Sequence, residues 1–277
     1  MDLSSIWAGV VPGLIIMGGL ILALVYYLVR IRPHRAAPRG AKERESTALV
    51  PSAVVDFFYT LLDPLMARLE RHQITPNQIT SSSLVLACTA ALLFGLGYWL
   101  WGAWVFALSA AGDGLDGMLA RQTGRTTRSG AFFDSFMDRL SEGAVFLGIA
   151  VYGQGGWLTW TAISALIASY AVSYARARGE ALGVDCRRGL MQRPERMVLI
   201  FFLAWGSPYL ALYLEPGVDR PVYHLAIAGT TFIALSALWT AIIRARFIFE
   251  TLRSGEVPRD LGRTSAEESI PAHLKST

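Results

Sequence analysis

The stretch DGLDGMLARQTGRTTRSGAFFDSFMD, residues 113–138, places four aspartates in an otherwise largely apolar part of the chain. Asp113 and Asp116 stand one helical turn apart, and Asp134 and Asp138 repeat this spacing, so each pair lies on one face of a helix. Carboxylates that face one another at low dielectric repel strongly, and each is costly at membrane depth. A shared cation relieves both costs, and hard oxygen ligands suit Mg²⁺ or Mn²⁺ better than zinc. The stretch therefore predicts two helices that meet at a site for divalent cations.

The composition indicates an integral membrane protein. Hydrophobic residues make up 53% of the 277 residues, and the mean hydropathy is +0.41. Only 17% of the residues are charged, whereas a soluble domain has roughly 25%. The two cysteines, Cys88 and Cys186, lie far apart and provide no disulfide or metal framework. The length leaves room for one helical bundle and little else.

The apolar runs predict an all-α fold with six transmembrane core helices and one extra transmembrane helix at the N-terminus. The core spans are expected at 79–100, 102–122, 131–152, 157–182, 194–214 and 222–249. The extra run, 6–29, is followed by basic residues rather than by a cleavage site, which indicates an uncleaved anchor. Residues 53–72 mix apolar and charged positions at helical spacing and predict an amphipathic interfacial helix; a soluble helix packed on the bundle is the alternative.

These elements divide the chain into four parts. Residues 1–31 form the anchor, 32–52 a linker rich in proline, alanine and charge, 53–254 the main domain, and 255–277 a polar tail. The core helices occupy 77–250. Thr75 is expected to cap the first of them, with Pro76 at its first position.

The basic residues predict the orientation in the membrane. They gather between spans two and three, between spans four and five, and after span six, whereas the opposite connections carry only Arg220. Basic loops remain on the cytoplasmic side, so the aspartates are expected near the cytoplasmic ends of spans two and three. We expect a multi-pass protein of the cell (inner) membrane with its site near the cytoplasmic face.

The motif also resembles a known signature. Its eight positions match, without a departure, those of the CDP-alcohol phosphotransferases: Asp113, Asp116, Gly117, Ala120, Arg121, Gly130, Asp134 and Asp138. The resemblance implies an enzyme of phospholipid biosynthesis that transfers a phosphatidyl group from a CDP-linked lipid, such as CDP-diacylglycerol, to an alcohol and releases CMP. It implies two divalent cations, Mg²⁺ or Mn²⁺, held mainly by Asp113, Asp116 and Asp134. Asp138 is then the general base for the acceptor hydroxyl and also contacts a metal.

Several residues are candidates for binding the CDP portion of the donor. Gly117 and Ala120 share the face of the acids and leave space for a substrate near the backbone. Arg121 adds a bidentate donor for phosphate oxygens. Gly130 belongs to the motif. Thr80 lies in the segment PNQIT, which resembles the P-N-x-x-T of many family members, and its depth one turn into the membrane would let it line the nucleotide pocket.

Four arginines are expected at the level of the acids: Arg176, Arg178, Arg193 and Arg196. Arginines at the cytoplasmic ends of spans also set topology, which is the alternative reading. Converging guanidinium groups favour a phosphorylated acceptor. Both segments resemble the subgroup that transfers inositol phosphate to a phosphatidyl or archaetidyl lipid, although Arg176 stands where that subgroup often has lysine. Inositol phosphate is therefore the first choice, and glycerol phosphate remains open.

Other predictions concern partners and rival functions. The resemblance and the small-residue core helices favour a homodimer among membrane lipids, and we expect no nucleic-acid partner. Glu142 extends the acidic stripe by one turn, either as a supporting acceptor or as a polar helix-face residue. A transporter that uses the acids as a cation relay is the rival class, and it predicts acids spread across the membrane depth.

Overall fold

The computed structural model describes residues 3–34, 52–186 and 188–255, and these residues contain helices and no strand. The predicted linker and polar tail lie largely outside the described residues. The helices follow one another as α1 (Leu3–Tyr26), the π-helix η1 (Tyr27–Ile31), the 3₁₀ helix η2 (Arg32–His34), α2 (Ser52–Arg71), α3 (Pro76–Leu96), α4 (Trp99–Gln122), α5 (Arg128–Tyr152), α6 (Trp157–Ala181), α7 (Arg193–Leu214) and α8 (His224–Ser254). The all-α prediction is confirmed.

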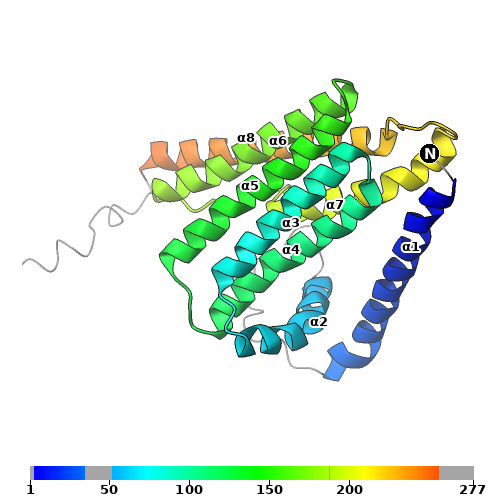
Figure 1. Ribbon diagram of the computed structural model, residues 1–277. Coiled ribbons are helices and arrows are strands. Elements are labelled where there is room, and N and C mark those ends of the chain that lie inside the picture. The colour runs from blue at the N-terminus through cyan, green and yellow to red at the C-terminus, as the bar shows by residue number, and fades with distance from the viewer. Residues whose placement is uncertain (1–2, 35–51, 187, 256–277) are drawn as a thin grey trace, which may run out of the picture.

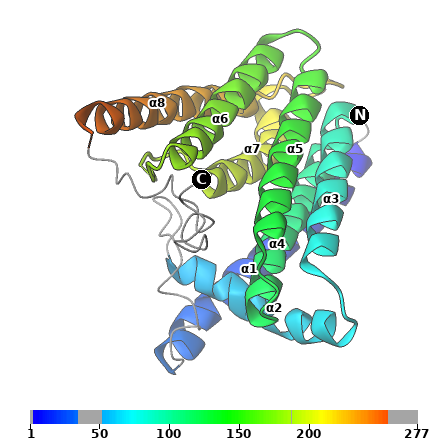
Figure 2. The same ribbon diagram turned by 90° about the vertical axis from the view of Figure 1, so that its left-hand side faces the viewer.

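Six long helices, α3 to α8, form the bundle (Figure 1). Helix α3 packs against both α4 and α5, and α6 packs against α8. Helix α7 also packs against α8, so α6, α7 and α8 form a second group. This group meets α3, α4 and α5 where α5 packs against α6 and where α4 packs against α7. Figure 2 shows α2 lying across the end of the bundle at which α4 ends and α5 begins. We call this end, which carries the motif aspartates, the acidic end.

Five helices of the described residues are long and apolar enough to cross a membrane by length and composition: Gly13–Ile31, Pro76–Leu96, Trp157–Ala181, Arg193–Leu214 and His224–Ser254. The chain is a multi-pass membrane protein. Helices α4 and α5 stand where two further spans were predicted, but they fall outside this set, so the predicted number of spans is not confirmed. The physical reason is that each of these two helices carries motif aspartates together with arginines, which lower its mean hydropathy.

The first core helix begins as predicted and ends earlier. The Thr75 hydroxyl accepts a hydrogen bond from the Gln78 N–H at 3.3 Å, and the Gln78 side-chain oxygen accepts one from the Thr75 N–H at 2.9 Å. This reciprocal capping box satisfies N–H groups that the first turn leaves open. The helix stops at Leu96 rather than residue 100 because Gly97 adopts a left-handed conformation with φ 92°. A glycine takes this conformation without steric cost.

Helix α1 contacts the bundle, and its extension η1 contacts α2. Gly13 of α1 faces α4 and α7, where an added Cβ would lie 3.1 Å from the Tyr209 hydroxyl and 3.4 Å from the Trp104 indole nitrogen. The Tyr27 ring of η1 is buried and packs against Phe57 of α2, with ring centroids 5.6 Å apart. Helix α2 in turn buries Met66 against apolar side chains of α3 and α4. Helix α1 therefore contacts the bundle directly, and α2 links η1 to α3 and α4.

Candidate active site

Three aspartates from two helices converge at the acidic end. Asp113 and Asp116 project from the last turns of α4 and Asp134 from the second turn of α5, and one oxygen of each lies within 4.8 Å of the others. Asp116 is buried, while the other two are half-buried. A cation of the size of Mg²⁺ or Mn²⁺ holds oxygens at about 2.1 Å, so its ligands lie within roughly 4 Å of one another. The donor atoms therefore suit a divalent cation, and their separation of up to 4.8 Å comes close to this limit.

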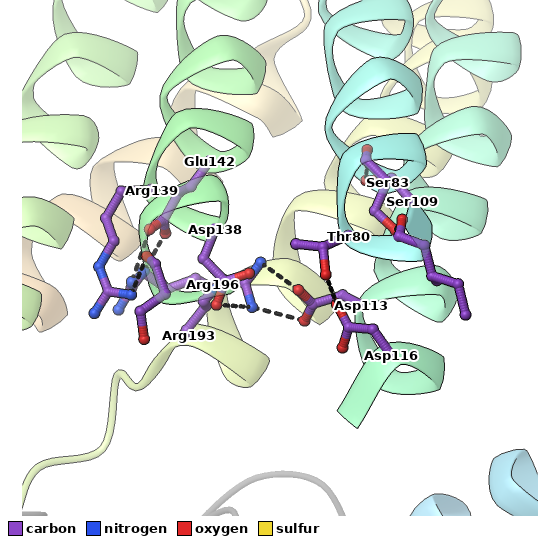
Figure 3. Close-up of polar contacts among 12 residues, drawn as sticks. Thr80, Ser83, Ser109, Asp113, Asp116, Asp138, Arg139, Glu142, Arg193 and Arg196 are labelled. Atoms are coloured by element: carbon purple, nitrogen blue, oxygen red, sulfur yellow. Dashed lines mark hydrogen bonds and ion pairs between the residues drawn. The ribbon is translucent and has the colours of Figure 1, made fainter. Parts of the chain in front are cut away.

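Thr80 of α3 is attached directly to this cluster. Its hydroxyl donates to the Asp116 carboxylate at 2.5 Å, and its side chain is buried (Figure 3). A bond to a charged acceptor is stronger than one between neutral groups, and it orients the carboxylate. Thr80 was predicted at the nucleotide pocket; the structure places it behind Asp116, on a contact that the sequence pattern did not reveal.

Arg193 joins an aspartate of α4 to an aspartate of α5. Its guanidinium donates to both Asp113 oxygens, at 2.7 and 3.3 Å, and one of the same nitrogens lies 2.7 Å from an Asp138 oxygen. This side chain is about 21% exposed, and Asp138 about 14%, so solvent reaches both groups. The structure thus brings the fourth motif acid beside the other three through an arginine at the first turn of α7.

Arg196 occupies a different environment, although it lies only one turn from Arg193. Its side chain is buried, and its guanidinium donates to the two Glu142 oxygens at 2.5 and 3.0 Å. A further nitrogen donates to the Met191 carbonyl oxygen at 3.0 Å. The prediction placed Arg196 among arginines open to an acceptor phosphate; its donors are instead committed to protein oxygens away from solvent. The sequence contains one indication of the Glu142–Arg196 pair. Glu142 lies one helical turn after Asp138, and Arg196 lies one turn after Arg193, so the two pairs can form side by side.

The other predicted arginines are more exposed. Arg176 of α6 forms an ion pair with Glu180 at 2.8 Å, one turn further along the same helix, and Arg178 is exposed. Arg121 is exposed at the end of α4, and a Cβ added to Gly117 would lie 3.3 Å from its guanidinium. The structure does not bring all four candidate acceptor arginines into one cluster.

Two small motif residues, Gly130 and Ala120, lie at the ends of α5 and α4 that border the site. Gly130 lies in the first turn of α5, and its N–H donates to the hydroxyl of the capping residue Thr127 at 3.0 Å. An added Cβ there would lie 3.0 Å from that hydroxyl. Ala120 is half-buried near the end of α4. Both residues thus keep side-chain bulk away from the region between the acidic ends of α4 and α5.

The fold and the site define a class: a helical membrane protein with a carboxylate cluster that could hold a metal ion at one end of its bundle. Residues 73–243 match the family described as CDP-alcohol phosphatidyltransferase, and the chain belongs to this family. The predicted resemblance is confirmed, and with it the enzyme class, phospholipid biosynthesis and dependence on a divalent cation.

Two similar relatives have names from the subgroup that transfers inositol phosphate. The chain is 35% identical over 193 residues to the phosphatidylinositol phosphate synthase of Streptomyces avermitilis, which covers 66% of this chain and 79% of the relative. It is 35% identical over 194 residues to the archaetidylinositol phosphate synthase of Methanothermobacter thermautotrophicus, which covers 69% and 90%.

Solved structures agree with this. The phosphatidylinositol phosphate synthase of Mycobacterium tuberculosis with CDP-DAG bound is 29% identical, with a TM-score of 0.58 over 67% of this chain and 92% of that one. The same enzyme in complex with manganese and citrate gives a TM-score of 0.59 over 67% and 88%.

Proposed function

We propose that this enzyme transfers the phosphatidyl group of CDP-diacylglycerol to inositol phosphate and releases CMP. The observation that carries the proposal is the Arg193 guanidinium, which lies between Asp113 of the three-carboxylate cluster and Asp138. It sets a phosphate-binding group beside a carboxylate that can take a proton. The relatives' names supply the acceptor, and the structure with CDP-DAG bound supplies the donor.

Each residue of the site then has a proposed role. Asp113, Asp116, Asp134 and Asp138 would hold two divalent cations, which supply charge neutralisation of the diphosphate and stabilise the entering and leaving oxygens. Thr80 orients Asp116 through its hydroxyl. The CDP portion would lie along Gly117, Ala120 and Arg121 toward Gly130, where small residues leave the backbone accessible.

The transfer is a single displacement at phosphorus. Asp138 accepts the proton of the acceptor hydroxyl, and the hydroxyl oxygen forms a bond to the lipid-side phosphorus. The bond from that phosphorus to the CMP oxygen breaks, and CMP leaves with the electron pair. Arg193 exchanges its carboxylate contacts for the phosphate of the acceptor, and Arg176 and Arg178 add positive charge for the same group. Arg196 is left out of this set because Glu142 and Met191 take up its donors.

The placement in the cell is also part of the proposal. The basic residues of the chain support an orientation in which the acidic end faces the cytoplasm, since basic loops stay on that side of the cell (inner) membrane. The CDP headgroup of the lipid donor is charged and lies at the membrane surface, and a phosphorylated alcohol is water-soluble, so a site at this face would meet both. The division into anchor, linker, main domain and tail, and the homodimer, remain predictions.

The test is CMP release by purified protein supplied with CDP-diacylglycerol and Mg²⁺ or Mn²⁺. The acceptors are inositol phosphate, glycerol phosphate, free inositol and serine, and Asp138→Asn is the control. We expect release that depends on inositol phosphate and is lost in the variant. Release with glycerol phosphate alone would retain the chemistry and overturn the acceptor. Absence of release with every acceptor, from folded protein, would overturn the proposed reaction.

A further inference from the structure

Two ion pairs connect α5 and α7 at successive turns (Figure 3). The outer pair joins Asp138 to Arg193 at 2.7 Å, and its side chains are 14% and 21% exposed. The inner pair joins Glu142 to Arg196 at 2.5 and 3.0 Å, with exposures of 4% and 1%. Residues three or four apart lie on one face of a helix, so the four side chains form a ladder of two rungs. Only the outer rung can meet a substrate.

The inner rung also fixes the chain that enters α7. The Arg196 guanidinium donates to the Met191 carbonyl, two residues before α7 begins at Arg193. Met191 is buried, and its N–H donates to the Thr240 hydroxyl of α8 at 3.2 Å. The start of α7 is therefore held by α5 on one side and by α8 on the other.

We propose that Glu142 and Arg196 are positioning residues that hold Arg193 opposite Asp113 and Asp138. This inference rests on the proposed function, in which Arg193 gives up its carboxylates for the acceptor phosphate. The start of α7 must then stay in place while the Arg193 side chain moves, and a buried bidentate pair one turn away provides that fixed point. Neither Glu142 nor Arg196 touches the substrate in this account.

Energetics supply a way to separate position from stability. Removing one partner of a buried ion pair leaves an uncompensated charge and is strongly destabilising, whereas replacing both partners by apolar side chains of similar volume is often neutral. Glu142→Leu together with Arg196→Met should therefore keep the thermal unfolding temperature near that of the wild type. The same double variant loses the oriented contacts to α5 and to the Met191 carbonyl.

The first measurement is the Michaelis constant for each substrate. We expect the double variant to raise KM for inositol phosphate about tenfold, the effect of roughly one lost oriented contact to a charged group. KM for CDP-diacylglycerol should stay within about twofold of the wild-type value, since Arg193 is proposed to bind the acceptor and not the donor. The matched control is Thr161→Val with Thr230→Val, which removes a 2.7 Å side-chain contact between α6 and α8 outside the site and should leave both constants unchanged.

The second measurement is a double-mutant cycle with Arg193→Ala. If the inner rung acts by positioning Arg193, the Glu142/Arg196 replacement should add no further rise in acceptor KM once Arg193 is gone. An equal rise in both backgrounds would show a general structural effect and would overturn the inference.

A third measurement does not depend on the acceptor. Arg193 shares the Asp113 and Asp138 carboxylates with any bound cation, so the loss of its position should raise Mn²⁺ affinity, as Arg193→Ala also should. Electron paramagnetic resonance of free Mn²⁺ measures this whichever alcohol is the substrate. If the wild-type protein does not use inositol phosphate as an acceptor, the proposed function is overturned but the positioning role is not. A double variant with wild-type Mn²⁺ affinity and wild-type acceptor KM would overturn the positioning role.

Discussion

The two ends of the bundle are held together by different forces. At the acidic end, helices meet through charges, as where Arg193 lies between Asp113 and Asp138. At the opposite end they meet through small residues and rings. A Cβ added to Gly148 of α5 would lie 2.2 Å from the Ala91 carbonyl of α3, and Trp99 packs on Tyr223 with ring centroids 4.6 Å apart.

Helix α5 belongs to both regions, and it shows what the difference means. Its N-terminal part carries Asp134, Asp138 and Glu142, and its C-terminal part carries the close contact at Gly148. Clustered acids are costly to the fold and are kept for chemistry, whereas a close helix approach contributes packing. Substitutions of the motif aspartates should therefore change turnover at nearly constant stability, and substitutions at the close helix contacts of the packed end should do the reverse.

The largest effect is expected for Asp116→Asn. The amide oxygen can still accept the Thr80 hydroxyl, and one of the mutually repelling charges is removed, so the unfolding temperature should hold or rise. Loss of a cation ligand should reduce CMP release about 10³-fold or more, which corresponds to roughly 4 kcal/mol of barrier. Initial rates and thermal unfolding in detergent measure the two quantities. A variant that keeps a tenth of the wild-type rate would contradict the assignment of Asp116.

Gly148→Ala should show the opposite behaviour. The added methyl group meets backbone atoms of Ala91, at 2.2 Å from the oxygen and 2.6 Å from Cα, so α3 and α5 must separate. We expect a loss of about 1–3 kcal/mol in the free energy of unfolding, as for other overpacked cores. Gly18→Ala is the control, since nothing lies within 4 Å of its added Cβ. Equal unfolding midpoints for the two variants would refute the close approach of α3 and α5.

Arg193→Ala tests whether the acidic end contains a phosphate-binding group in addition to its acids. Hydrogen bonds to charged groups contribute about 1.5–3 kcal/mol, so KM for inositol phosphate should rise roughly 10- to 100-fold. Steady-state kinetics with the acceptor varied at saturating CDP-diacylglycerol measure the change. A fall in kcat with an unchanged acceptor KM would assign Arg193 to the acids alone.

The smallest effect is expected for Thr75→Ala, which removes the cap of α3 near the acidic end. Loss of this bond to the Gln78 N–H should cost about 1 kcal/mol of stability. Thr75 makes no contact with the aspartates among the described interactions, so the rate per folded molecule should stay within about twofold of the wild type. A large loss of turnover in folded Thr75→Ala protein would mean that the cap of α3 also affects catalysis, contrary to this expectation.

The sequence predicts most of the fold and part of the site. The apolar runs locate the helices to within a few residues, and the capping pattern at Thr75 is confirmed, because both depend on local residue order. The end of α3 at Gly97 was missed because an apolar run alone does not show where a glycine turns left-handed.

The roles of the two α7 arginines could not be separated from the sequence. Arg193 and Arg196 lie one turn apart with similar neighbours, and only the rotation of α7 against α5 makes one accessible and buries the other on Glu142. The same holds for Thr80, whose partner Asp116 lies 36 residues away. Contacts between helices depend on packing angles that a one-dimensional pattern does not contain.

The central claim is that Asp113, Asp116 and Asp134 hold a divalent cation. Its most direct test is a Mn²⁺ titration, followed by electron paramagnetic resonance, of the wild type and of Asp116→Asn. The account predicts saturable binding by the wild type and binding at least about tenfold weaker in the variant, with the unfolding temperature preserved. Equal Mn²⁺ affinity in the two folded proteins would contradict it.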